Sequence, residues 1–180
     1  MADERDLAEA ALMRSSTSDS LLPDDWPPVA RRVREARQHL GLSEGDIASR
    51  LGITLSEYWD IEAHNDEAFE CVSVRHLEHL ATILGVSLTS LLFGSQIEAS
   101  PTRISFATIA ARLQELAASQ GRTIDQLGDV VGWDLTGVIA NPESLDQFNL
   151  VGLRDVCRAI DIDWVSALPR PEMTDRLTTG

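Results

Sequence analysis

The sequence predicts an all-α protein made of two tandem five-helix units, the second a degenerate copy of the first. Apolar residues recur at steps of three and four between glycines, which is the pattern of amphipathic helices with one buried face. No alternating run of β-branched residues stands between the turn signals, so we expect no strands. The same spacing returns about 80 residues further along the chain, which indicates an internal repeat.

The first unit is expected at residues 29–94, after an acidic N-terminal arm at residues 1–28. Its first helix ends at Gly41. The second and third helices each begin with a capping box, in which a hydroxyl at Ser43 or Thr54 is followed three residues later by a carboxylate. The buried faces of these three helices are expected to comprise Val29, Val33, Ala36 and Leu40 in the first, Ile47, Ala48 and Leu51 in the second, and Tyr58 and Ile61 in the third.

Two further helices complete this unit after a polar break at residues 64–67. Apolar residues from Val74 to Leu84 recur on one face and predict a fourth amphipathic helix, which Gly85 ends. A short fifth helix is expected from Ser87 to Leu92. Five short helices in about 65 residues make a complete small helical unit.

The second unit is expected at residues 103–168, between a linker at residues 95–102 and a tail at residues 169–180. At a shift of 80 positions, the glycines that end the first two helices fall on glycines again, and later in the unit the shift becomes 76. Four residues are therefore missing, and we expect the third helix of the copy to be lost or shortened. The correspondences are Gly41 with Gly121, Gly52 with Gly132 and Leu77 with Leu153.

Composition and charge restrict the classes of function. The chain has 180 residues, 43% apolar and 24% charged, which is the balance of a globular protein. It has 15 arginines, no lysine and 29 carboxylates, for a formal net charge of −14. Such a chain repels nucleic acid and anionic lipid overall, so binding either would need a local cationic patch. With no apolar run near the roughly 20 residues of a membrane span and no secretion signal, we expect a cytoplasmic protein without a membrane partner.

No motif for catalysis or metal binding stands out. We find no nucleophile–base pair, phosphate-binding loop or carboxylate dyad at a meaningful spacing, so we expect no enzyme and no cofactor. His76 and His79 lack a third ligand, and no metal site is expected. Cys71 and Cys157 match no metal spacing and are interpreted as reduced core thiols.

Residues 40–62, with the sequence LGLSEGDIASRLGITLSEYWDIE, resemble the helix-turn-helix of the XRE family, the Cro and phage-repressor type. The features that carry the resemblance are the small Ala48, the Leu-Gly-Ile at 51–53, the hydroxyl of Thr54 and the Ile-Glu at 61–62. The segment LGVSLTSLL at residues 84–92 is also typical of the family. The match covers residues 29–94, and the copy at 103–168 is a weaker one.

The resemblance implies a DNA-binding transcriptional regulator with double-stranded DNA as its partner. The third helix would enter the major groove and the first two would contact phosphates, with the two copies, or the two chains of a homodimer, on adjacent half-sites. Glu44 stands where relatives often have a glutamine that touches the DNA backbone. The groove-facing residues would be Thr54, Leu55, Ser56, Glu57 and Asp60, and the phosphate contacts Arg31, Arg32, Arg34, Arg37 and Arg50.

The residues of the third helix favour an alternative, an acidic protein-binding module on the same fold, such as an antitoxin, an anti-regulator or an adaptor. No arginine lies between Arg50 and Arg75, and base readers are usually cationic or amide side chains. If Tyr58 and Ile61 face inward, an apolar pair shares another face, typical of a protein contact. The candidates for this contact are Leu55, Trp59, Glu57 and Asp60.

Four features of this segment have simpler readings that the sequence leaves open. Glu57 would serve as the carboxylate of its capping box, and Glu62 as a structural acid at a position where the family commonly has one. The arginines of the first helix would form a solvated face. Trp59 would pack under the loop at residues 64–71 or under the N-terminal arm.

Overall fold

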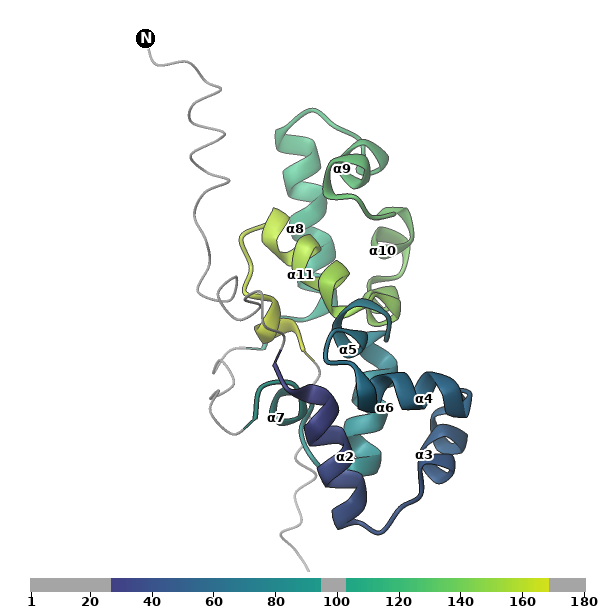
Figure 1. The fold of residues 1–180 in the computed structure, drawn as a ribbon. Helices are drawn as coiled ribbons and strands as arrows, with labels where there is room; N and C mark the ends of the chain where they lie inside the picture. The colour runs from purple at the N-terminus through teal and green to yellow at the C-terminus, as the bar shows by residue number, and fades with distance from the viewer. Residues whose placement is uncertain (1–26, 95–102, 169–180) are drawn as a thin grey trace, which may run out of the picture.

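The computed structural model describes residues 27–94 and 103–168, all in helices and the turns between them (Figure 1). In the described part of the chain the only β-type pairing is an isolated antiparallel bridge between Ser73 and Asn149, so the all-α prediction is confirmed. The linker, the tail and the arm up to residue 26 lie outside the described residues. No helix of the described part is long and apolar enough to cross a membrane.

The first half has the expected helices and one more. A short helix, α5, occupies part of the predicted break, because the apolar Ala68 and Phe69 are both fully buried there. Leu40 is 47% exposed, so the buried face of the first helix ends before it, which corrects the prediction. The helices are α2 (Val29–His39), α3 (Glu44–Leu51), α4 (Leu55–Ala63), α5 (Glu67–Glu70), α6 (Val74–Leu84) and α7 (Leu88–Phe93).

The second half is also helical, with shorter elements at its centre. The helix α10 has five residues, and Pro142 then begins a 3₁₀ helix, η3. The last helix is also a 3₁₀ helix, η4. The repeat relation between the two halves stays a prediction. The elements are α8 (Phe106–Ser119), α9 (Ile124–Val131), α10 (Thr136–Ala140), η3 (Pro142–Gln147), α11 (Leu150–Ala159) and η4 (Trp164–Ala167).

The predicted capping boxes are present and fix where the helices start. The Thr54 hydroxyl accepts a hydrogen bond from the Glu57 N–H at 3.2 Å, and the Glu57 carboxylate accepts one from the Thr54 N–H at 2.6 Å. Ser43 and Asp46 pair in the same way at the start of α3. Gly52 ends α3 in the left-handed conformation (φ 73°), so a three-residue turn joins α3 to α4.

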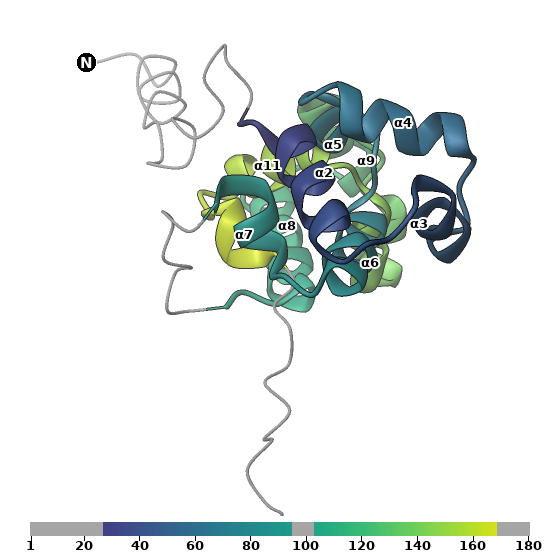
Figure 2. The same cartoon turned by 60° about the horizontal axis from the view of Figure 1, so that its bottom comes forward.

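The two halves pack against each other, and their buried apolar residues form one continuous cluster. The Phe93 and Trp164 rings meet edge to face, with centroids 5.7 Å apart. The Val74 N–H donates to the Phe148 carbonyl at 2.8 Å, which brings the start of α6 beside η3. Figures 1 and 2 show α3 and α4 at the edge of the molecule away from α8. The outer face of α4 is therefore not used in joining the halves.

Candidate functional site

Helix α4 lies against α2 and α3 through one face and leaves the other exposed. Tyr58 and Ile61 point into the core and are 0% and 2% exposed, as the spacing predicts. Leu55 and Trp59, four residues apart, are 41% and 51% exposed and share the outer face. Two large apolar side chains thus lie on the surface within one helical turn.

All five residues predicted to face the groove are exposed. Thr54 and Glu57 also bond each other in the capping box. Glu57 is therefore exposed, as a groove-facing residue would be, and is at the same time the carboxylate of the box. The hydrogen bond from the Thr54 N–H lowers the pKa of the Glu57 carboxyl, which is ionised at neutral pH. The other three members of the exposed set are Leu55, Ser56 and Asp60.

Arg37, predicted to contact phosphate, is instead buried in an ion pair with Glu62. Its Nε donates to Glu62 Oε1 at 2.6 Å and its Nη2 to Glu62 Oε2 at 2.9 Å. Its other bonds reach the Leu42 carbonyl at 3.1 Å and Glu44 Oε1 at 3.3 Å. Four of its five N–H groups are therefore used within the chain, and the residue is 9% exposed. This placement leaves Arg37 a poor candidate for a phosphate contact.

Glu62 is the structural acid that the simpler reading expects. Besides the guanidinium of Arg37, its carboxylate accepts a hydrogen bond from the Tyr58 hydroxyl at 2.6 Å. Burial alone would raise the pKa of the Glu62 carboxyl, but the bonds from Arg37 and Tyr58 outweigh it and lower that pKa. The same hydrogen bond from Arg37 to Glu62 raises the pKa of the guanidinium. The ion pair joins α2 to the end of α4.

Two more of the predicted phosphate contacts have partners within the chain. Arg32 donates to the Leu92 carbonyl at 2.7 Å at the end of α7, and partial burial lowers the pKa of its guanidinium. Arg34 donates to the Glu62 backbone carbonyl at 2.6 Å, and its side chain stays 50% exposed. Arg32 is thus mainly a cap for α7, while Arg34 still reaches solvent.

The two remaining arginines lie on the surface. Arg31 is exposed and pairs with Glu35 one turn later at 3.6 Å. Arg50 is exposed on α3 and acts electrostatically on Asp46. Exposed pairs of this kind are weak, at about 0.5 kcal/mol or less, so both guanidinium groups can meet an outside anion. Of the predicted cationic set, Arg31, Arg34 and Arg50 are accessible.

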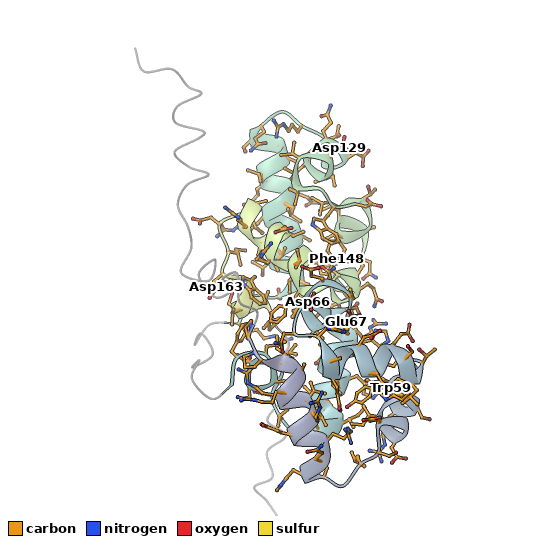
Figure 3. The ribbon with its side chains drawn as sticks, in the orientation of Figure 1. Trp59, Asp66, Glu67, Asp129, Phe148 and Asp163 are labelled. Atoms are coloured by element: carbon orange, nitrogen blue, oxygen red, sulfur yellow. The ribbon has the colours of Figure 1, made fainter. Side chains whose placement is uncertain are left out.

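Glu44 connects the buried ion pair to the exposed face of α4. One carboxylate oxygen accepts from Arg37 Nη2, and the other accepts from the indole Nε1–H of Trp59 at 2.5 Å. Figure 3 shows the Trp59 side chain beside α3 and α4. Trp59 is 51% exposed, and its indole N–H is engaged by Glu44 of α3. Sequence reasoning missed this role of Glu44, because residues 15 positions apart in sequence carry no signal of contact.

Two acidic side chains flank the apolar pair of α4: Glu44 reaches Trp59 from α3, and Asp60 follows Trp59 along α4. Glu57, two residues from each member of the pair, lies on the other flank of the helix. Neither α4 nor α5 contains an arginine or lysine. In the described part of the chain, Glu57 and Asp60 form no ion pair with a cation. We call Leu55 and Trp59, with Glu44 and Asp60, the α4 surface.

The other residues singled out in the sequence form no second site. Cys157 is buried, as predicted, and burial raises the pKa of its thiol to about 12. Cys71 is exposed, so the prediction of a core thiol is wrong there, because residue 71 falls after the short helix α5 and before the buried Val74. The described residues contain no group of three side chains able to hold a metal ion.

Comparisons with protein-family models, with curated proteins and with solved structures find no match to this chain.

Proposed function

We propose that the chain is a protein-binding regulator on a helix-turn-helix scaffold, with the α4 surface as its binding site. The observation that carries the proposal is the exposure of Leu55 and Trp59 one turn apart on the same helix. Tryptophan is the residue type most enriched among those that dominate the energy of protein interfaces. Antitoxins, anti-regulators and adaptors are the kinds of regulator that act through such a contact.

Electrostatics argue against DNA as the ligand of this surface. A carboxylate placed about 4 Å from a phosphate costs about 1 kcal/mol in bulk water and about 4 kcal/mol near a protein surface. Glu44, Glu57 and Asp60 would all lie near the duplex if α4 entered the major groove. Arg37, which would have offset part of this repulsion, is already paired with Glu62.

DNA binding is the second candidate, and the arrangement of α3 and α4 favours it. A short turn joins the two helices, and Leu55, Ser56 and Asp60 are exposed at the positions where the XRE resemblance places base contacts. Arg31, Arg34 and Arg50 are the accessible cations. Fold resemblance is an analogy rather than a site argument, so this candidate ranks second. A regulator that binds both a protein and its own promoter would combine the two.

A photo-crosslinking residue at Ser56 tests the proposal in the cells that carry the gene. Ser56 is exposed next to Leu55, and a matched control is Asp129 on α9, at the far end of the molecule from Trp59 (Figure 3). We expect protein adducts at position 56 that are absent at position 129 and are lost on Trp59→Ala. Nucleic-acid adducts at position 56 would overturn the proposal in favour of DNA.

Fluorescence anisotropy of labelled duplex DNA, from random and genomic pools, provides the complementary test in vitro. The salt dependence of binding reports the number of phosphates neutralised, so titrations at roughly 50 and 200 mM salt measure the contribution of the arginines. We expect no sequence-selective binding from the folded chain. A pool fraction that stays bound at the higher salt would favour the second candidate.

A further inference from the structure

We infer that the α4 surface receives a cationic amphipathic helix, with an apolar stripe over Leu55 and Trp59 and arginine or lysine side chains against the flanking carboxylates. This inference rests on the proposed function and gives the partner a chemical class.

The apolar pair has the dimensions of a helix contact. Residues four apart on α4 place Leu55 and Trp59 about 6 Å from one another along the helix, which is one turn. The i, i+3, i+4 stripe of a second helix covers a patch of that length. No described segment of the chain lies over the pair, since both side chains stay about half exposed.

Trp59 is already oriented before any partner arrives. Its indole N–H is bonded to Glu44, and Glu44 is held by the buried Arg37. The polar edge of the ring is therefore satisfied within the chain, and its apolar surface is what remains for a partner. A ring fixed in this way loses little side-chain entropy on binding, and the face of an indole also attracts cations.

Charge decides the chemistry of the partner. Asp60 forms no ion pair among the described residues, and Glu44 leaves 40% of its side chain exposed while bonded to Arg37. Glu57, on the other flank of α4, interacts electrostatically with His76. A partner with neutral or acidic flanks would bury or approach these carboxylates without compensation. Arginine or lysine on both sides of an apolar stripe would pair with them.

The same charges disfavour the other occupants. A second copy of this chain would bring identical carboxylates against Glu44 and Asp60, so the predicted homodimer is disfavoured through this face. Anionic lipid and nucleic acid meet the same repulsion.

Titration of the full chain against designed helical peptides tests the inference. The probe is a labelled amphipathic peptide of about 18 residues, five turns, with a leucine stripe flanked by arginines. Two companion peptides carry serine or glutamate in place of every arginine. We expect binding of the arginine peptide that weakens with salt, and at least tenfold weaker binding of the serine and glutamate peptides.

Substitutions in the chain locate the binding. Trp59→Ala and, separately, Leu55→Ser should each weaken binding of the arginine peptide about tenfold. Asp60→Asn should weaken that binding severalfold and flatten its salt dependence, while Glu57→Gln, on the other flank of α4, should change it little. The matched controls, Val130→Ala and Asp129→Asn on the exposed face of α9, should leave binding unchanged. Glutamine is itself a good residue for a capping box, so α4 keeps its start.

The two proposals fail in different ways. If the serine peptide binds as tightly as the arginine peptide and Trp59→Ala still abolishes binding, the charge inference is overturned and the protein-binding surface stands. If the arginine peptide does not bind, this inference is overturned. The same holds if the α9 control substitutions weaken binding of the arginine peptide as much as Trp59→Ala does. If labelled duplex DNA, titrated without any peptide, binds the chain and this binding is lost on Leu55→Ser, the proposed function itself is overturned in favour of the DNA-binding candidate.

Discussion

Arg37 and Glu62 form a buried two-bond ion pair that ties the end of α2 to the end of α4, at N–O distances of 2.6 and 2.9 Å. The carboxylate also accepts from Tyr58, and the guanidinium also bonds Leu42 and Glu44. Every substitution at this pair therefore changes the support of α4 as well as a charge. A loss of binding after changing Arg37 would report on the scaffold and not on a contact with phosphate.

Arg37→Ala is expected to destabilise the chain by about 3 kcal/mol, because it removes the two-bond partner of the buried Glu62. The carboxylate would keep the Tyr58 hydroxyl and the longer contact with Arg34 Nε at 3.6 Å, which hold the cost at the lower end for a buried pair. Urea unfolding followed by circular dichroism measures the free energy. The control is Arg31→Ala, which removes an exposed arginine of the same helix and should change the free energy by about 0.5 kcal/mol or less. Replacing both partners, Arg37→Met with Glu62→Met, should recover most of the loss. Equal stability of Arg37→Ala and Arg31→Ala would mean that the pair does not hold the fold.

Stability should fall below about pH 4.5, the ordinary value for glutamate, because the pKa of the Glu62 carboxyl is lowered in the folded chain. A group whose folded pKa is depressed stabilises the fold above its unfolded pKa, and that contribution is lost as pH falls through the folded pKa. Urea titrations at neutral pH and at two acidic values measure the slope. The double variant Arg37→Met with Glu62→Met lacks this group and should show a shallower loss, whereas an unchanged slope would assign the acid sensitivity to other carboxylates.

Glu44→Ala is expected to release the indole of Trp59 with little change in stability. The hydrogen bond from the indole lies at the surface, and such bonds contribute about 1 kcal/mol at most to the free energy of unfolding. In a nitrogen–proton correlation spectrum, one of the four tryptophan indole signals should shift. Trp59→Phe identifies that signal by its disappearance. Should Glu44→Ala move the indole signal of the buried Trp164 instead, the role assigned to Glu44 would be wrong.

Helix positions could be predicted from the sequence because their signals are local. Capping boxes at Ser43 and Thr54 define where two helices start, and glycines after α3 and α6 define where two helices end. Each of these signals involves residues only a few positions apart. The packing of the two halves could not be predicted, since contacts such as Phe93 with Trp164 join positions far apart in sequence.

The buried position of Arg37 could have been predicted from its spacing in the sequence, although an arginine is usually expected at the surface. It follows Val33 by four residues and so continues the buried stripe of α2, where a solvated arginine would not stand. Glu62 likewise follows Tyr58 by four residues on the inner side of α4. A charged residue on each of two apolar stripes indicates a buried ion pair, although one sequence alone does not say that the two stripes face each other.

Gly152→Ala tests the packing of the second half. A β-carbon at this position of α11 would lie 2.9 Å from the ring of Trp133, closer than atoms of a packed core approach. The ring cannot shift freely, because it stacks on Phe148 at 5.4 Å between centroids and its Nε1 faces Asp155. Gly152→Ala should therefore destabilise the chain by about 1–3 kcal/mol in urea unfolding, as overpacking does.

The matched control for this change is Gly137→Ala in α10. No atom lies within 4 Å of a β-carbon added at Gly137, and alanine favours the helix by up to about 1 kcal/mol. The two alanine variants should therefore move stability in opposite directions. Because Phe148 also accepts the hydrogen bond from the Val74 N–H, a displaced Trp133 disturbs the contact between the halves, and the backbone amide of Val74 should exchange faster in Gly152→Ala than in the control. Unchanged exchange at Val74 alongside a lower stability would confine the strain to the second half.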